Sequence, residues 1–191
     1  MKQVVFIDRD GTLVVDKDYP AEPEELEFFD GVPEALVKIE KAGFELVIVT
    51  NQSGVARGYF DETTVEKMHE HLREMLNSCG VSPLDIYYCP AHPEAKKERY
   101  RRGLERRKPA PGMLLEAAEE HDIELESSFM IGDKLSDVRA GRRAGCRSIL
   151  VRTGKGESEA QKLEEKGDVK PDYIATALPA AVDWILRQSG S

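Results

Sequence analysis

Residues 4–13 read Val-Val-Phe-Ile-Asp-Arg-Asp-Gly-Thr-Leu, a short apolar run that ends in two carboxylates one residue apart. The first four residues have the length and β-branched content of a buried strand, and Asp10-Gly11 is a turn signal. Because residues two apart in a strand point to the same side, Asp8 and Asp10 can face one site. The alternative for this stretch alone is a strand followed by a turn, with both side chains in solvent.

Strand-like and helix-like segments alternate along the rest of the chain. Further strands are predicted at 44–49, 86–89, 129–131, 148–151 and 172–174, and helices at 33–41, from Asp61 to Gly80, from Pro111, from a Ser136 cap to Gly145, after 151 and around Trp184. This alternation favours right-handed βαβ units, so the predicted fold class is α/β, a doubly wound parallel sheet covered on both faces. We expect a single domain, 1–191, with an irregular segment at 90–110.

The composition is typical of a compact cytoplasmic protein. The 36 acidic and 27 basic residues give a net charge of −9, which argues against a general nucleic-acid or membrane surface. The three cysteines, Cys79, Cys89 and Cys146, form no Cys-x-x-Cys pair, as expected in a reducing compartment. The N-terminal apolar run meets Asp8 too soon for a signal peptide, and no stretch approaches the length of a membrane span.

Polar residues follow the predicted strands. The carboxyl ends of parallel strands share one edge of a sheet, where α/β proteins collect their ligands. The residues expected to converge there are Asp8, Asp10, Thr50, Asn51 and Asp133. Three carboxylates suit Mg²⁺, and a hydroxyl, an amide and Lys108 suit the oxygens of a phosphoryl group. A purely structural cation site is the alternative.

Electrostatic repulsion makes a cation necessary for phosphate binding at this site. At an effective dielectric constant of about 20, two like charges about 4 Å apart repel by roughly 4 kcal/mol. A phosphate dianion beside ionised aspartates would therefore be expelled unless a divalent cation and Lys108 reversed the balance.

Four segments in order resemble the motifs of the haloacid dehalogenase superfamily of aspartate-nucleophile phosphatases, over nearly the whole chain. They are Asp8-Arg9-Asp10-Gly11-Thr12-Leu13, Val49-Thr50-Asn51-Gln52-Ser53-Gly54, Arg107-Lys108-Pro109 and Gly132-Asp133-Lys134-x-x-Asp137. The resemblance implies the Rossmann-like fold of that superfamily, here with a minimal cap. Residues 16–19, 28–32, 51–59, 87–90 and 107–115 resemble, more narrowly, the D-glycero-D-manno-heptose 1,7-bisphosphate 7-phosphatases, whose relatives are the histidinol-phosphate phosphatases.

The resemblance implies a role for each matching residue. Asp8 would be the nucleophile, and Asp10 a general acid and base with a raised pKa. Mg²⁺ would be held by Asp8, the main-chain carbonyl of Asp10, and Asp133. Thr50, Asn51 and Lys108 would hold the phosphoryl oxygens. The remaining substrate-contact positions are Asp16, Tyr19, Ser53, Arg107 and Lys134. Asp137 would orient Lys134 or the motif loop rather than bind the metal directly.

The chain departs from the narrower family in the segment before Arg107. Those phosphatases usually carry a structural zinc held by a Cys-x-His pair and a later Cys-x-Cys pair. Here Cys89 is followed two residues on by Ala91, His92 comes one residue late, and Leu104 and Arg106 replace the later cysteines. We therefore expect no zinc.

The same segment is basic instead. Its cations are Lys96, Lys97, Arg99, Arg101, Arg102, Arg106, Arg107 and Lys108. Either they form a positive rim that attracts a bisphosphate, or residues 95–108 are a solvated loop. For all but Arg107 and Lys108, the solvated loop is favoured slightly.

Other residues give weaker signals. His69 and His71 are predicted to be surface residues, because positions two apart on a helix do not share a face. Gly154-Lys155-Gly156 lacks the upstream glycine and following hydroxyl of a P-loop. Trp184 is predicted to anchor the last helix to the core.

Three functions remain open. The leading hypothesis is a Mg²⁺-dependent phosphatase that converts a sugar bisphosphate, foremost heptose 1,7-bisphosphate, to the 1-phosphate, with histidinol phosphate as an alternative substrate. A polynucleotide 3′-phosphatase shares two of the motifs but is disfavoured by the net charge and by the basic segment's single aromatic residue, Tyr100. A non-catalytic phosphate-binding module is disfavoured because every chemical position is intact. A monomer is expected for so short a cap.

Overall fold

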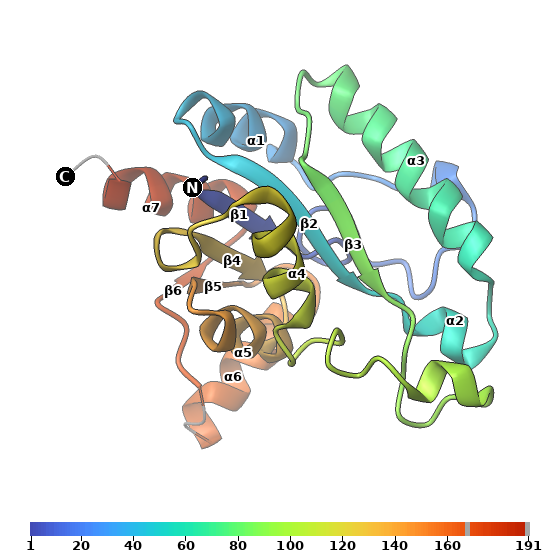
Figure 1. Ribbon diagram of the computed structural model, residues 1–191. Helices are drawn as coiled ribbons and strands as arrows, with labels where there is room; N and C mark the ends of the chain where they lie inside the picture. Colours follow the sequence, from blue (N-terminus) through green and yellow to red (C-terminus); the bar gives the residue numbers. More distant parts are fainter. Residues whose placement is uncertain (167–168, 190–191) are drawn as a thin grey trace.

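The computed structural model describes residues 1–166 and 169–189, which form one parallel sheet of six strands in the order β3-β2-β1-β4-β5-β6 (Figure 1). The strands are β1 (Val4–Ile7), β2 (Glu45–Asn51), β3 (Asp85–Cys89), β4 (Phe129–Gly132), β5 (Arg147–Val151) and β6 (Tyr173–Ala175). The helices are α1 (Val32–Lys41), α2 (Ser53–Arg57), α3 (Glu62–Ser78), α4 (Gly112–His121), α5 (Leu135–Ala144), α6 (Gly156–Lys166) and α7 (Leu178–Ser189). Short 3₁₀ turns lie at Pro23–Glu25, Glu98–Arg101 and Leu125–Ser127. The predicted α/β class is confirmed.

The alternation of side chains along β1 assigns a core to each face of the sheet. Val5 and Ile7 pack with apolar residues of α1, α3 and α7. Val4 and Phe6 point the other way and pack with α4 and α5. Trp184 of α7 stacks on Tyr173 and packs against the first core, as predicted. A strand buried on both faces is continuously apolar, which is why residues 4–7 carry no polar side chain.

The strand order places a crevice at the end of β1. The chain runs from β1 through β2 to β3 on one side, then from β4 through β5 to β6 on the other. This change of direction is a topological switch point, where α/β proteins bind ligands beyond the carboxyl ends of the strands. Between β1 and α1 the structure has one 3₁₀ turn and no larger insertion, as expected for a minimal cap.

Two local predictions were wrong by a few residues. The second strand continues to Asn51 instead of ending at Val49, because Thr50 and Asn51 pair in register with Tyr88 and Cys89 of β3. Helix α5 has Lys134, not Ser136, at its N-cap position, because the carboxylate of Asp137 accepts a hydrogen bond from the Lys134 amide at 2.9 Å.

The segment 90–110 is irregular but packed. Ala95 and Tyr100 are buried in a small cluster with Val55, Ala56 and Val65. The Tyr100 hydroxyl donates to Glu62 at 2.8 Å, so the segment is tied to α3. No helix within the described ranges combines the length and the apolarity needed to cross a bilayer.

Candidate active site

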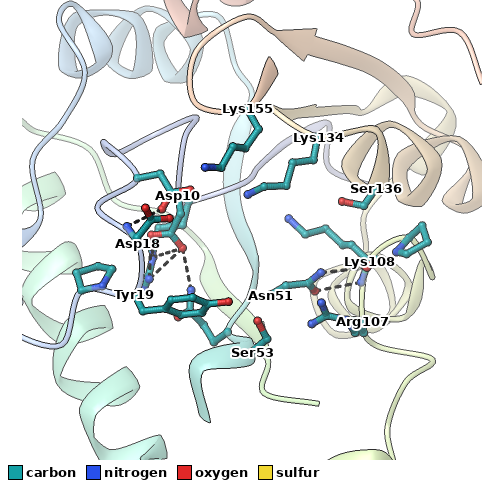
Figure 2. Close-up of a pocket in the computed structure, with 15 residues that line it drawn as sticks. Asp10, Asp18, Tyr19, Asn51, Ser53, Arg107, Lys108, Lys134, Ser136 and Lys155 are labelled. Carbon is teal, nitrogen blue, oxygen red and sulfur yellow. Dashed lines mark hydrogen bonds and ion pairs between the residues drawn. The ribbon is translucent and has the colours of Figure 1, made fainter. Parts of the chain in front are cut away.

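Two cavities lie at the carboxyl ends of the strands. The larger has a volume of about 470 Å³, and the smaller, of about 30 Å³, shares part of its lining. Of the predicted site residues, the larger cavity is lined by Asp10, Asp16, Tyr19, Asn51, Ser53, Arg107, Lys108 and Lys134 (Figure 2). Asp8 and Thr50 line the smaller one, and Asp133 lies beside Asp8. The structure therefore brings together every residue that the motifs singled out.

Lys108 is a buried cation at the base of the site. Its ammonium lies 2.7 Å from Asp8 Oδ1, 2.7 Å from Asp137 Oδ1 and 2.7 Å from the carbonyl oxygen of Val49. Burial opposes its charge, but Asp137 and Asp8 outweigh burial and raise the pKa of Lys108. Lys108 is therefore charged at neutral pH and holds the carboxylate of Asp8 in one orientation.

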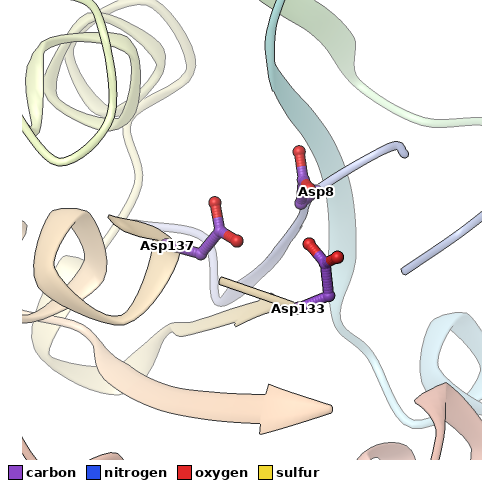
Figure 3. A group of neighbouring side chains, drawn as sticks. All are labelled: Asp8, Asp133 and Asp137. Atoms are coloured by element: carbon purple, nitrogen blue, oxygen red, sulfur yellow. The ribbon is translucent and has the colours of Figure 1, made fainter. Parts of the chain in front are cut away.

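Asp8, Asp133 and Asp137 form a buried carboxylate cluster (Figure 3). One oxygen of each lies within 4.8 Å of the others, which makes this the one candidate metal cluster of three or more such side chains in the described part of the chain. Asp133 Oδ1 is buried and accepts no hydrogen bond. Burial, with the charge of Asp8, raises the pKa of Asp133 to about 7. Three hard oxygen donors, one without a hydrogen bond, fit a divalent cation such as Mg²⁺.

Asp10 is held by its neighbours away from this cluster. Arg9 donates to both carboxylate oxygens of Asp10 at 3.0–3.1 Å, and Gln52 Nε2 donates to Asp10 Oδ2 at 2.9 Å. Thr50 Oγ1 lies 3.5 Å from the same oxygen and accepts a hydrogen bond from Gln52 at 2.9 Å. Burial alone would raise the pKa of Asp10, but Arg9 and Gln52 outweigh it, and the pKa lies below its usual value. The predicted raised pKa of Asp10 is therefore wrong in this structure.

Asn51 binds the main chain of Lys108. Its Nδ2 donates to the Lys108 carbonyl at 3.0 Å, and its Oδ1 accepts from the Lys108 amide at 3.1 Å. The side chain was expected to hold a phosphoryl oxygen. Here both of its polar atoms are engaged in fixing the segment that delivers Lys108 to Asp8.

The outer wall of the larger cavity carries further cations. The Lys134 ammonium lies 3.5 Å from Asp133, and the carboxylates of Asp8 and Asp133 raise its pKa even though burial opposes the charge. Arg107 is half-buried and donates to the carbonyl of Ala91 at 3.0 Å. Burial lowers the pKa of Arg107, which nevertheless stays a cation.

Three other cations of the basic segment bind their own neighbours. Arg102 pairs with Glu98 at 2.9 Å, Arg106 with Glu116 at 2.8 Å, and Arg101 donates to the carbonyl of Ala95 at 2.7 Å. None of these three residues lines either cavity in the described structure. Their placement supports solvated charges over a positive rim, except at Arg107 and Lys108, although the segment itself packs against α3.

His69 corrects a prediction, because it is buried and not a surface residue. Its ring packs edge-on against Tyr88, and burial, together with the charge of Arg9, lowers its pKa to about 3. The rule that positions two apart face different sides is sound, and it placed His71 correctly in a partly exposed position. It could not tell which of the two sides was covered.

Sequence reasoning gave no role to Arg9 or Gln52. Both are almost completely buried, and both hold Asp10. Both lie inside recognised motifs, Arg9 between Asp8 and Asp10 and Gln52 next to Asn51. Their polar side chains beside predicted site residues could have indicated that they hold Asp10. Ser136 and Lys155 also line the larger cavity and were missed.

Two curated bacterial proteins are similar to this chain over most of its length. The D-glycero-beta-D-manno-heptose-1,7-bisphosphate 7-phosphatase of Photorhabdus laumondii is 49% identical over 152 residues, which are 79% of this chain and 81% of that protein. Its counterpart of the same name in Pasteurella multocida is 46% identical over 179 residues, 93% of this chain and 94% of that protein. This chain belongs to the D-glycero-D-manno-heptose-1,7-bisphosphate 7-phosphatase family.

A solved member of this heptose-bisphosphate phosphatase family has the same fold. The D,D-heptose 1,7-bisphosphate phosphatase of B. bronchiseptica, crystallised with magnesium and phosphate, is 32% identical and superposes with a TM-score of 0.84 over 98% of this chain and 99% of its own. The HAD-hydrolase-like family model matches residues 105–181, from the basic segment to α7. The chain is thus a phosphoric monoester hydrolase of the haloacid dehalogenase type, as the four motifs predicted.

Proposed function

We propose that this enzyme hydrolyses D-glycero-β-D-manno-heptose 1,7-bisphosphate to the 1-phosphate through an aspartyl-phosphate at Asp8. The observation that carries the proposal is the buried carboxylate of Asp8, fixed 2.7 Å from the Lys108 ammonium in the smaller cavity. The names of the relatives that are 46–49% identical support this substrate and its β anomer over histidinol phosphate or a polynucleotide.

In the first half-reaction a carboxylate oxygen of Asp8 attacks the 7-phosphorus, and the bond from phosphorus to the sugar oxygen breaks. Asp10 takes up a proton from solvent as the phosphate binds and donates it to the departing oxygen. Arg9 and Gln52 hold Asp10 ionised before substrate binds, and the negative charge of the incoming phosphate raises its affinity for a proton. Lys108 neutralises charge at Asp8 and on the phosphoryl oxygens.

In the second half-reaction water attacks phosphorus, and the bond to Asp8 breaks. Asp10, now a carboxylate, accepts the proton of the water. Arg9 and Gln52 favour this charged form, so their hydrogen bonds assist the step. The products are inorganic phosphate and Asp8 with its carboxylate restored.

Mg²⁺ would be held by Asp8, Asp133 and the main-chain carbonyl of Asp10, and when bound it offsets the repulsion between the aspartates and the phosphate. Asp137 lies within the same cluster, so it is close enough to assist. Lys134, Arg107, Tyr19, Asp16 and Ser53 line the larger cavity, where we place the sugar and its 1-phosphate.

The test is phosphate release, with Mg²⁺, from both anomers of the heptose bisphosphate and from histidinol phosphate. Asp8→Asn is run beside wild type, with Asp30→Asn, an exposed aspartate, as the matched control. We expect wild type and the control to prefer the β anomer and Asp8→Asn to be inactive. Preference for histidinol phosphate would overturn the substrate, and an active Asp8→Asn would overturn the mechanism.

We also propose a cytoplasmic monomer with a single domain over 1–191 and no zinc; residues 167–168 and 190–191 of that domain lie outside the described structure. Against zinc, the Cys89 thiol donates to the carbonyl of Gly103 at 3.7 Å, and His92 accepts from the Glu94 amide and contacts Arg57. Metal analysis and the mass measured by light scattering test these points.

A further inference from the structure

The turn after β5, residues 153–156, is fixed against the carboxylate cluster. The Thr153 hydroxyl donates to the carbonyl of Gly11 at 2.7 Å, and the amide of Lys155 donates to Asp133 Oδ2 at 2.8 Å. Gly154 has φ +56°, and a Cβ there would lie 2.3 Å from Asp133 Oδ2 and 2.6 Å from the Cα of Gly11. The turn therefore has one position relative to the first motif and Asp133, and Lys155 is placed by its main chain.

The side chain of Lys155 extends from this fixed point to the larger cavity. Figure 2 shows its ammonium and that of Lys134 directed into the same space, from two neighbouring segments. Lys155 lines the larger cavity and not the smaller one that contains Asp8. It is thus placed for a part of the substrate away from the reacting phosphorus.

Lys155 differs from the other cations of the cavity in its partners. Arg9 binds Asp10, Lys108 binds Asp8 and Asp137, and Arg107 donates to a main-chain carbonyl. Within the described residues, no carboxylate lies within 4 Å of the Lys155 ammonium, and it donates no hydrogen bond. An exposed, unengaged ammonium on a rigid turn at a cavity wall is available to an anionic ligand without breaking an internal contact.

We propose that Lys155 is a substrate-binding residue that contacts the phosphate that is not transferred. This rests on the proposed function, in which the substrate carries a second phosphate. A lysine ammonium on a flexible stem is a point charge, and it can follow an anion whose position varies with the sugar. The residue selects bisphosphates over monophosphates and takes no part in breaking the bond.

The substitution Lys155→Met tests this role cleanly, because it keeps the main-chain amide that binds Asp133 and removes only the charge. Steady-state kinetics compare the heptose 1,7-bisphosphate with the heptose 7-phosphate, which lacks the second anion. We expect KM for the bisphosphate to rise about 10- to 100-fold, as for the loss of one charge-assisted hydrogen bond, with kcat little changed. The preference for the bisphosphate, as the ratio of the two kcat/KM values, should fall by the same factor.

Two further variants complete the experiment. Lys155→Arg should recover part of the preference, and Lys67→Met, an exposed lysine on α3, should keep all of it. If Lys155→Met kept the wild-type preference, the role of Lys155 alone would be overturned. An equal loss of kcat/KM with both substrates would overturn it too, because that result would indicate a disturbed Asp133. Wild type without any preference for the bisphosphate would overturn the proposed substrate and the role of Lys155 together.

Discussion

Two regions of the protein contain clustered charges in opposite surroundings. One is the site floor, which consists of Asp8, Lys108, Asp133 and Asp137, and the other is the basic segment, residues 96–107, which ends one residue before Lys108. In the floor, four charged groups are almost completely buried, and one lysine binds two carboxylates. In the basic segment most cations are exposed, and the side chain of Arg102 is 79% accessible. The site floor has a small net charge, and the basic segment has a large one.

The position of a charge, and not the number of charges, decides what that charge does in this protein. A pair of charges in a low-dielectric site interacts several times more strongly than the same pair in water. Exposed ion pairs contribute about 0–1 kcal/mol and are screened by salt. A cluster of eight cations is the most conspicuous electrostatic feature of the sequence, yet the buried lysine at its end is the one that contacts Asp8 and Asp137.

Removing Lys108 should have the largest effect. Lys108→Met leaves Asp8 and Asp137 buried without their cation, and we expect kcat to fall about 10²- to 10³-fold. Without Mg²⁺, the free energy of unfolding should fall by about 3–5 kcal/mol, the cost of a broken buried pair. Kinetics and urea unfolding measure both. Lys96→Met, in the exposed part of the basic segment, should match wild type in kcat and in the free energy of unfolding. Equal effects of the two substitutions would refute the claim that buried and exposed charges differ in what they do.

Asn51 should come next, because it holds the main chain that delivers Lys108. Asn51→Ala should lower kcat about 10- to 100-fold, since a displacement of about 1 Å in a catalytic group has effects of this size. Asn51→Asp keeps the acceptor for the Lys108 amide and loses the donor to the Lys108 carbonyl. Its kcat should therefore lie between those of the wild type and Asn51→Ala. Binding of inorganic phosphate separates two roles for Asn51, positioning Lys108 and contacting the phosphoryl group. If Asn51 only positions Lys108, Asn51→Ala should leave phosphate binding unchanged. Loss of phosphate binding would support a direct contact.

Asn51 and Lys108 also show which features of the site the sequence could predict and which it could not. The motifs and the alternation of strands predicted the sheet, its switch point and the residues at its edge, because strand ends converge in any parallel sheet. They did not predict that Asn51 would bind Lys108, which is 57 residues away. Such pairings depend on how the segment before α4 crosses the edge, and no local pattern encodes that path.

The remaining errors have similar causes. Ser136 suits a helix cap, but α5 begins two residues earlier, with Lys134 at the N-cap position, because the carboxylate of Asp137 accepts a hydrogen bond from the Lys134 amide. His69 is buried because Tyr88 of β3 and the segment 90–110 cover that side of α3. The turn that contains Lys155 contacts Asp133 because β5 lies beside β4, a neighbour relation that the sequence order alone leaves open.

Burial of His69 should have a moderate effect on how the free energy of unfolding depends on pH. Its pKa is about 3 in the folded protein, against about 6.5 in the unfolded chain. Between these values the unfolded chain binds one more proton, so stability is present above pH 6.5 and is lost as pH falls, by up to about 1.4 kcal/mol per unit. Urea unfolding from pH 6.5 to 4.5 should show a shallower loss for His69→Met than for wild type, whereas His71→Met should retain the wild-type slope.

The smallest effect is expected in the basic segment itself. The double substitution Lys97→Met, Arg102→Met removes two exposed charges that line neither cavity in the described structure. At physiological ionic strength the screening length is about 8 Å, so we expect kcat/KM for the bisphosphate to change less than about 3-fold. Arg107→Met, which removes a half-buried cation of the cavity wall, should lower it more. If the double variant instead lost activity steeply, and more at low salt than at high salt, the exposed cations would be steering the substrate, and the number of charges would matter after all.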